Sequence, residues 1–212
     1  MSKSTLAIIL IILSSFIIAI ALYPIMPESM ASHWNAEGVV NGYINKFWGL
    51  FLMPLIFLIL FCVFIIIPKI DPLKDNIAKF RSSFERFVVL IKLFLFYIYI
   101  LTIFWNLDFK FDMVTAMIPA FAILFYYIGV MTGKAKRNYF IGIRTPWTLS
   151  SDEVWDKTHA LGGKLFKAAG VISLAGLFFP KIAFCFVIIP VLLSALISAT
   201  YSYFVWKKTK TT

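Results

Sequence analysis

Hydrophobic residues in this sequence gather into six long runs separated by shorter polar segments. Each run approaches the ~20 apolar residues that an α-helix needs to cross the hydrocarbon core of a bilayer. Stretches such as LIFLILFCVFIII lack the alternation of a membrane β-barrel strand. Because backbone polar groups cannot stay unpaired in lipid, the runs predict helices. We expect these helices over Thr5–Tyr23, Phe47–Ile67, Phe87–Leu107, Met113–Met131, Leu165–Phe179 and Ile182–Trp206.

The six runs predict an all-α, polytopic membrane protein with one transmembrane bundle. Composition agrees, since 14% of the residues are charged, against ~25% in soluble domains. Residues 1–80 are expected to form a two-helix region, and residues 81–212 a four-helix region with a polar loop at 133–164. The first run could also be a signal peptide ending at the small residues Ala19-Ile20-Ala21, but its length favours a retained helix.

The positions of the basic residues predict the orientation of this bundle. The chain has 20 Lys and Arg against 10 Asp and Glu. With the N-terminus inside, sixteen of these basic residues fall in inner loops and ends, while only Lys46, Lys110 and Lys181 fall outside. The positive-inside rule therefore predicts that both termini lie in the cytoplasm. We expect the protein to lie in the plasma membrane. Anionic lipid at the inner surface accounts for this basic charge, so we expect no direct nucleic-acid binding.

The chain offers little for catalysis or metal binding. Lys92 is the only charged residue deep inside a run, and we expect its amine to reach the inner headgroups, with an ion pathway as the alternative. His33 and His159 fall on opposite faces and cannot share a metal ion. Cys62 and Cys185 are expected to be buried thiols. No nucleophile pair, Gly-rich phosphate loop or metal motif is present, so we expect no catalytic residues and no cofactor.

The loop after the first run contains specific residue types. Aromatic residues next to a span are typical of the interfacial belt, and glycines suit turns that need positive φ. This loop is therefore either folded onto the outer surface or placed to recognise an external ligand. The candidate ligand-binding residues are His33, Trp34, Asn35, Gly38 and Gly42.

Residues 138–164, which we call the signature segment, form the one long polar stretch of the chain. Its second half predicts a short amphipathic helix with Ser150 as N-cap and Glu153 as the capping-box partner. This helix is expected to run to about Leu161 and to stop at Gly162-Gly163.

The first half of the signature segment predicts a constrained turn. Arg144 could stack on Trp147 or bind a lipid phosphate. Two interpretations remain open, namely structural or lipid anchoring and a surface for a protein partner. The candidate partner-binding residues are Asn138, Gly142, Arg144, Thr145, Pro146, Trp147, Trp155 and His159.

Small residues in the last two runs predict that these helices pack closely. Ala169 and Ser173 are four apart, as are Ser194, Ser198 and Ser202. In lipid, small residues at this spacing let helix backbones approach one another. We therefore expect the fifth and sixth transmembrane helices to form a tight hairpin.

Two sequence motifs resemble a known family. GIRTPWTLSSDEVWDKTH, followed by Gly-Gly-Lys and an apolar run, resembles the SdpI family of bacterial immunity membrane proteins. HWNAEGVVNGY resembles the motif of a small N-terminal domain of unknown function that often precedes that region. The resemblance implies protection of the producing cell from a secreted toxic peptide on the outer side. It also implies capture of a cytoplasmic transcriptional repressor or other protein at the membrane.

The alternative function is a small transporter or channel-like membrane protein. It would require the helices that contain Pro54, Pro119 and Pro190 to be kinked around a polar cavity.

Overall fold

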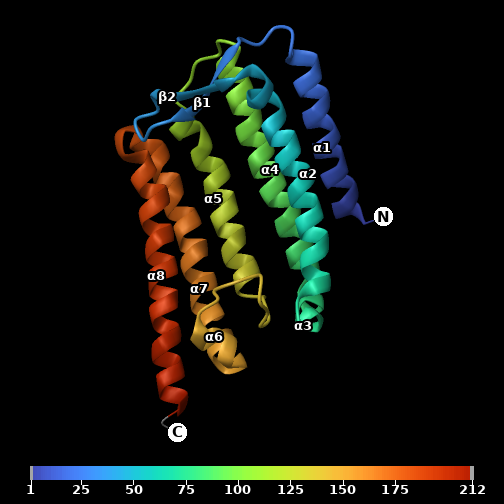
Figure 1. Cartoon of the computed structure of the whole chain (residues 1–212). Helices are drawn as coiled ribbons and strands as arrows, with labels where there is room; N and C mark the ends of the chain where they lie inside the picture. Colours follow the sequence, from blue (N-terminus) through green and yellow to red (C-terminus); the bar gives the residue numbers. More distant parts are fainter. Residues whose placement is uncertain (1, 211–212) are drawn as a thin grey trace.

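Long helices dominate the computed structural model, which describes residues 2–210 (Figure 1). Residues 1 and 211–212, at the outer bounds of the two expected regions, lie outside this described part. The elements in chain order are α1 (Lys3–Leu22), β1 (Ser29–Trp34), β2 (Val40–Asn45), α2 (Lys46–Ile70), α3 (Lys74–Lys79), α4 (Arg81–Asn106), α5 (Met113–Thr132), α6 (Pro146–Ser150), α7 (Asp152–Ser173), the 3₁₀ turns η1 (Leu174–Phe178) and η2 (Pro180–Ile182), and α8 (Ala183–Lys210).

The long helices α1, α2, α4, α5, α7 and α8 confirm the predicted polytopic helical bundle. These helices, the last two together with the adjoining 3₁₀ turns, are long and apolar enough to cross a membrane. They run alternately up and down, so β1 and β2 lie at one end of the bundle (Figure 1). We call this the hairpin end. The opposite end, which we call the signature end, holds α3, α6 and the C-terminus, and α1 also begins toward this end (Figure 1).

A two-stranded antiparallel hairpin, which the sequence reasoning missed, closes the hairpin end. Ala31 lies opposite Tyr43 at a non-hydrogen-bonded position of the antiparallel pair, so its backbone groups face away from β2 and need other partners. Asn106, at the end of α4, supplies them. Its Oδ1 accepts from the Ala31 amide at 2.8 Å, and its Nδ2 donates to the Ala31 carbonyl at 3.0 Å. With Met30 fully buried beside it, the hairpin is fixed on the bundle.

Helices α5 and α7 approach so closely that their glycines touch. A Cβ atom added at Gly129 would lie 2.6 Å from the Gly163 carbonyl oxygen and 2.6 Å from the Lys167 amide nitrogen. The prediction that a helix stops at Gly162-Gly163 was wrong, since α7 continues without a break from Asp152 to Ser173. The glycines are needed for close packing between helices rather than for a helix end.

The predicted hairpin of the last two transmembrane helices is confirmed. Helices α7 and α8 pack along their length, and Ser194, Ser198 and Ser202 are buried between elements of the bundle. Ser198 donates to the Ser194 carbonyl at 2.6 Å, so burial leaves its hydroxyl satisfied within its own helix.

Two predictions about the interior were wrong. Lys92 does not reach the headgroups, because it is fully buried and its Nζ donates to the Phe57 carbonyl oxygen of α2 at 2.6 Å. The carbonyl replaces the water that the ammonium group would otherwise need. Cys62 and Cys185 are exposed on the helix surface rather than buried. Their apolar character suits the lipid-facing surface equally well.

The glycine contact predicts a large effect of one methyl group. Gly129→Ala should lower the free energy of unfolding by about 1–3 kcal/mol, because the added carbon meets backbone atoms that cannot rotate away. Gly133→Ala is the matched control, since its nearest neighbour would be 3.6 Å away, an ordinary contact. Denaturant titration in mixed micelles measures both variants, and equal stabilities would contradict the close approach.

Candidate functional site

The signature segment begins with a turn that is organised by Asn138. This side chain is fully buried. Its Oδ1 accepts from the Phe140 and Ile141 amides at 2.9 and 2.6 Å, and its Nδ2 donates to the Lys136 and Ile141 carbonyls at 2.8 and 2.9 Å. One amide group thereby satisfies four backbone atoms that would otherwise be unpaired in a buried turn. Asn138 shapes this turn from within.

The turn is seated on two stacked rings of α7. Trp155 and His159 are buried, with ring centroids 3.9 Å apart and planes 14° from parallel. The Trp155 Nε1 donates to the Ala135 carbonyl at 2.8 Å, and the Ile143 amide donates to the His159 Nε2 at 3.0 Å. Gly142, at φ +114°, lies against the edges of both rings, and a Cβ there would collide with the imidazole. The chain must therefore have glycine at this position.

These contacts define the protonation of His159. A backbone amide can only donate, so the Nε2 that receives the Ile143 amide has no proton. The Nδ1 lies 2.8 Å from the Trp155 carbonyl and must carry the ring hydrogen. The imidazole is neutral in this arrangement, and a second proton would set two donors against each other.

A short helix, α6, follows the turn and connects it to α8. Thr145 is its N-cap in a capping box with Thr148, and Pro146 occupies the first turn. The Thr145 hydroxyl lies 2.9 Å from the Ser202 hydroxyl of α8. The predicted capping of α7 was one residue early. Its N-cap is Ser151, because α6 takes Ser150 as its last residue.

The junction between α2 and α3 holds the signature segment from the other side. Asp71 is buried, and its Oδ2 accepts from the Tyr139 amide at 2.9 Å. The Asn76 side chain donates to the Arg137 carbonyl at 2.9 Å. Arg137 in turn pairs with Asp152 at the start of α7, at 2.6 Å. The sequence reasoning missed Asp71, whose position at the end of an apolar run resembles an ordinary helix flank.

The candidate partner-binding residues divide by burial. Asn138, Trp155 and His159 are buried, whereas Gly142, Thr145 and Trp147 are half-buried and Arg144 and Pro146 are exposed.

Arg144 donates to the Tyr139 carbonyl at 2.8 Å, while Trp147 packs edge-on against Tyr203 of α8. Tyr139 and Phe140 are 46% and 37% exposed beside this arginine, and the sequence reasoning did not single them out. We call Tyr139, Phe140, Arg144 and Pro146 the signature face.

The candidate ligand-binding residues of the outer loop lie in the hairpin. Asn35 shapes its turn by accepting from the Val39 amide at 2.8 Å, and Gly38 has the expected positive φ, +76°. Gly42 instead allows close approach, since a Cβ there would lie 2.8 Å from the Cβ of His33. Trp34 packs edge-on against Trp105 of α4. His33 is exposed and lies 2.5 Å from the Asn41 side chain.

The two histidines lie at opposite ends of the bundle, as expected. Within residues 2–210, no group of three or more His, Cys, Asp or Glu side chains is placed to hold a metal ion.

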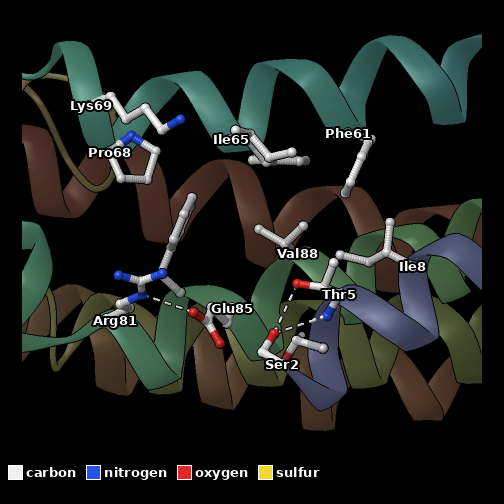
Figure 2. Close-up of a pocket in the computed structure, with 13 residues that line it drawn as sticks. Ser2, Thr5, Ile8, Phe61, Ile65, Pro68, Lys69, Arg81, Glu85 and Val88 are labelled. Atoms are coloured by element: carbon white, nitrogen blue, oxygen red, sulfur yellow. Dashed lines mark hydrogen bonds and ion pairs between the residues drawn. The ribbon is translucent and has the colours of Figure 1, made fainter.

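A separate cavity of about 270 Å³ opens between α1, α2 and α4 at the signature end. Figure 2 shows Lys69 on the α2 wall facing Arg81 and Glu85 on the α4 wall, with Phe61, Val88 and Ile8 deeper inside. Arg81 and Glu85 pair with each other at 2.9 Å. The lining combines these charged groups and the hydroxyls of Ser2 and Thr5 with apolar side chains. One turn beyond Val88, α4 holds the buried Lys92.

Fold and site together define a multi-pass helical membrane protein with a fixed polar segment at one end of its bundle. Residues 134–202 match the SdpI/YfhL protein family, and residues 10–58 match a Domain of unknown function (DUF1648). The resemblance to the SdpI family seen in the sequence motifs is thus confirmed for the C-terminal region of the chain.

One relative matches the chain from end to end. Immunity protein SdpI of Bacillus subtilis (strain 168) is 27% identical over 209 residues, which cover 98% of this chain and 98% of that protein. No solved structure matches the chain.

Because the turn packs on Trp155, we expect substitutions of Trp155 and of Arg144 to differ in their effect on stability. Trp155→Ala should lower the free energy of unfolding by ~3–5 kcal/mol, because a buried ring is removed. Trp155→Phe should have a smaller effect, since it keeps ring stacking and loses the hydrogen bond to Ala135. Arg144→Ala should change stability by less than about 0.5 kcal/mol, as for other exposed positions. Denaturant titration of the three variants tests this order, and an unperturbed Trp155→Ala protein would contradict it.

Proposed function

We propose that this protein is an immunity protein of the plasma membrane that protects its producing cell from a secreted, membrane-active toxic peptide. The main support is the match to Immunity protein SdpI over nearly the whole of both chains. The match therefore covers the N-terminal helices, the hairpin and the signature segment of this chain. The absence of a metal cluster among the described residues is compatible with this role and does not carry it.

The proposed orientation has the hairpin end outside and the signature end in the cytoplasm. It rests on the asymmetry of basic residues, sixteen of which fall toward the signature end. A toxic peptide would then meet the hairpin first. Exposed aromatic residues gather there, since Tyr43 is 63% and Trp48 is 49% exposed. Such residues suit both the membrane interface and contact with an amphipathic peptide.

The signature face would contact a cytoplasmic protein, for which a transcriptional repressor is the partner that the family resemblance implies. Aromatic residues and arginine are the side chains most often found at the energetic centre of protein interfaces. Here Tyr139, Phe140 and Arg144 are exposed on a turn whose backbone is held by buried groups. A fixed turn loses little conformational entropy on binding, which favours recognition.

Arg144→Ala tests this proposal. The host is a Bacillus subtilis strain that lacks SdpI and is sensitive to the corresponding peptide toxin. The unchanged protein should restore growth, whereas Arg144→Ala should be made at the same level and fold normally but fail to protect or to recruit the partner. Lys74→Ala is the control, because Lys74 is an exposed cation at the same end of the bundle.

Two results would contradict the proposal at different levels. Failure of the unchanged protein to protect against this toxin, and against peptides encoded beside its own gene, removes immunity. Full protection and recruitment by a well-folded Arg144→Ala protein removes the role of the signature face while leaving immunity intact.

A further inference from the structure

The seam between α5 and α7 forms one groove with two chemically different parts. Toward the signature end, a cleft of about 280 Å³ is lined by Lys134, Lys164 and Lys167. Further along the same two helices, a second cleft of about 340 Å³ is lined almost wholly by carbon, including Ile123 and Val171. The two parts follow one another on the same faces, because Lys164, Lys167, Val171 and the adjoining Leu174 are spaced three or four residues apart.

The cationic part is not neutralised by the protein. No Asp or Glu lines the cleft, and the three lysines form no ion pair within residues 2–210. The Lys167 side chain packs across Gly129, where a Cβ would lie 2.7 Å from its Cγ. The close approach of the two backbones thus brings Lys134, just after the end of α5, to the same cleft as Lys164 and Lys167 of α7. Such a cluster between membrane helices is suited to a phosphate group.

The two parts of the groove together span about one leaflet of the hydrocarbon core. From Lys164 to Leu174, α7 rises about 15 Å, which is half the ~30 Å thickness of the hydrocarbon core. Gly170 keeps this stretch of the groove narrow, since a Cβ there would lie 2.6 Å from the Ala122 carbonyl of α5. Ile123 and Val171, each 59% exposed, form its walls. The cationic cleft lies toward the end of the bundle and the apolar cleft lies further in, which matches the positions of the phosphate and the acyl chain in a phospholipid.

We propose that the α5–α7 groove is a specific site for an anionic phospholipid. The phosphate binds Lys134, Lys164 and Lys167, and one acyl chain lies against Ile123 and Val171. The lipid belongs to the leaflet at the signature end. By covering the seam directly beside α7, it supports the helix on which the signature segment is seated. The site does not depend on the proposed immunity function, and it is tested on the purified full chain.

Titration with dioleoylphosphatidylglycerol, followed by native mass spectrometry from detergent, measures the site. The unchanged protein should retain this lipid in preference to dioleoylphosphatidylcholine. The double variant Lys164→Gln/Lys167→Gln should bind phosphatidylglycerol about tenfold more weakly or worse. The charge-matched control Lys74→Gln/Lys181→Gln, which removes two exposed lysines elsewhere, should bind it as the unchanged protein does.

A second variant tests the apolar part without changing charge. Val171→Trp should fill the groove and reduce phosphatidylglycerol retention, whereas Leu196→Trp, at a 64% exposed position on α8, should not. Thermal unfolding in phosphatidylcholine micelles identifies variants that fail to fold. If the double lysine variant fails to fold, Val171→Trp alone tests the site. Equal retention of the two lipids, or equal binding by the groove variants and their controls, would overturn the site. The groove variants could instead change the number of protein copies in each detergent particle and leave lipid retention unchanged. That result would assign the groove to self-association, which would also overturn the lipid site.

Discussion

The hydrogen bond from the Ile143 amide to the His159 Nε2 is the contact on which the arrangement of the signature segment depends. A turn that contains several polar backbone groups can lie against a membrane bundle only if those groups find partners. His159 supplies one acceptor, Trp155 one donor, and Asn138 four further contacts. Gly142 is required because the imidazole lies where a Cβ would be. The polar groups of the signature segment are therefore paired internally first, and only the remaining side chains are exposed for contact with other molecules.

Helix α7 connects this segment to the rest of the molecule. Near its start, Trp155 and His159 hydrogen-bond the signature segment. Further along, Gly163 contacts α5, and the helix packs against α8 around Ser198. Because these contacts lie on one continuous helix, the segment at the signature end and the packing inside the bundle are parts of one rigid unit. The exposed Arg144 takes its position from this unit rather than from an ion pair of its own.

Much of the fold followed from apolar run length, because a bilayer demands helices of a set size. The six spans were predicted in this way, and the spacing of small residues predicted the close contact of α7 with α8. The hairpin was not, because its strands are short and it is held on the bundle by a residue distant in the sequence, Asn106. Gly162-Gly163 was misread as a helix end, since the same residue type serves both a cap and a close helix contact. Lys92 was misplaced because its partner is a backbone carbonyl, which no side-chain pattern reveals. The sequence also did not show which candidate site residues are buried, such as Asn138, and which are exposed, such as Arg144.

Hydrogen–deuterium exchange of the signature segment tests most directly the claim that it is a fixed platform. The Tyr139, Ile141 and Ile143 amides each donate to a side chain of Asp71, Asn138 or His159. They should therefore exchange as slowly as helical amides at the exposed end of the bundle, and the amide of Ile143 should lose protection when His159 is replaced by alanine. Exchange of all three amides at the rate of an unstructured loop would contradict the account.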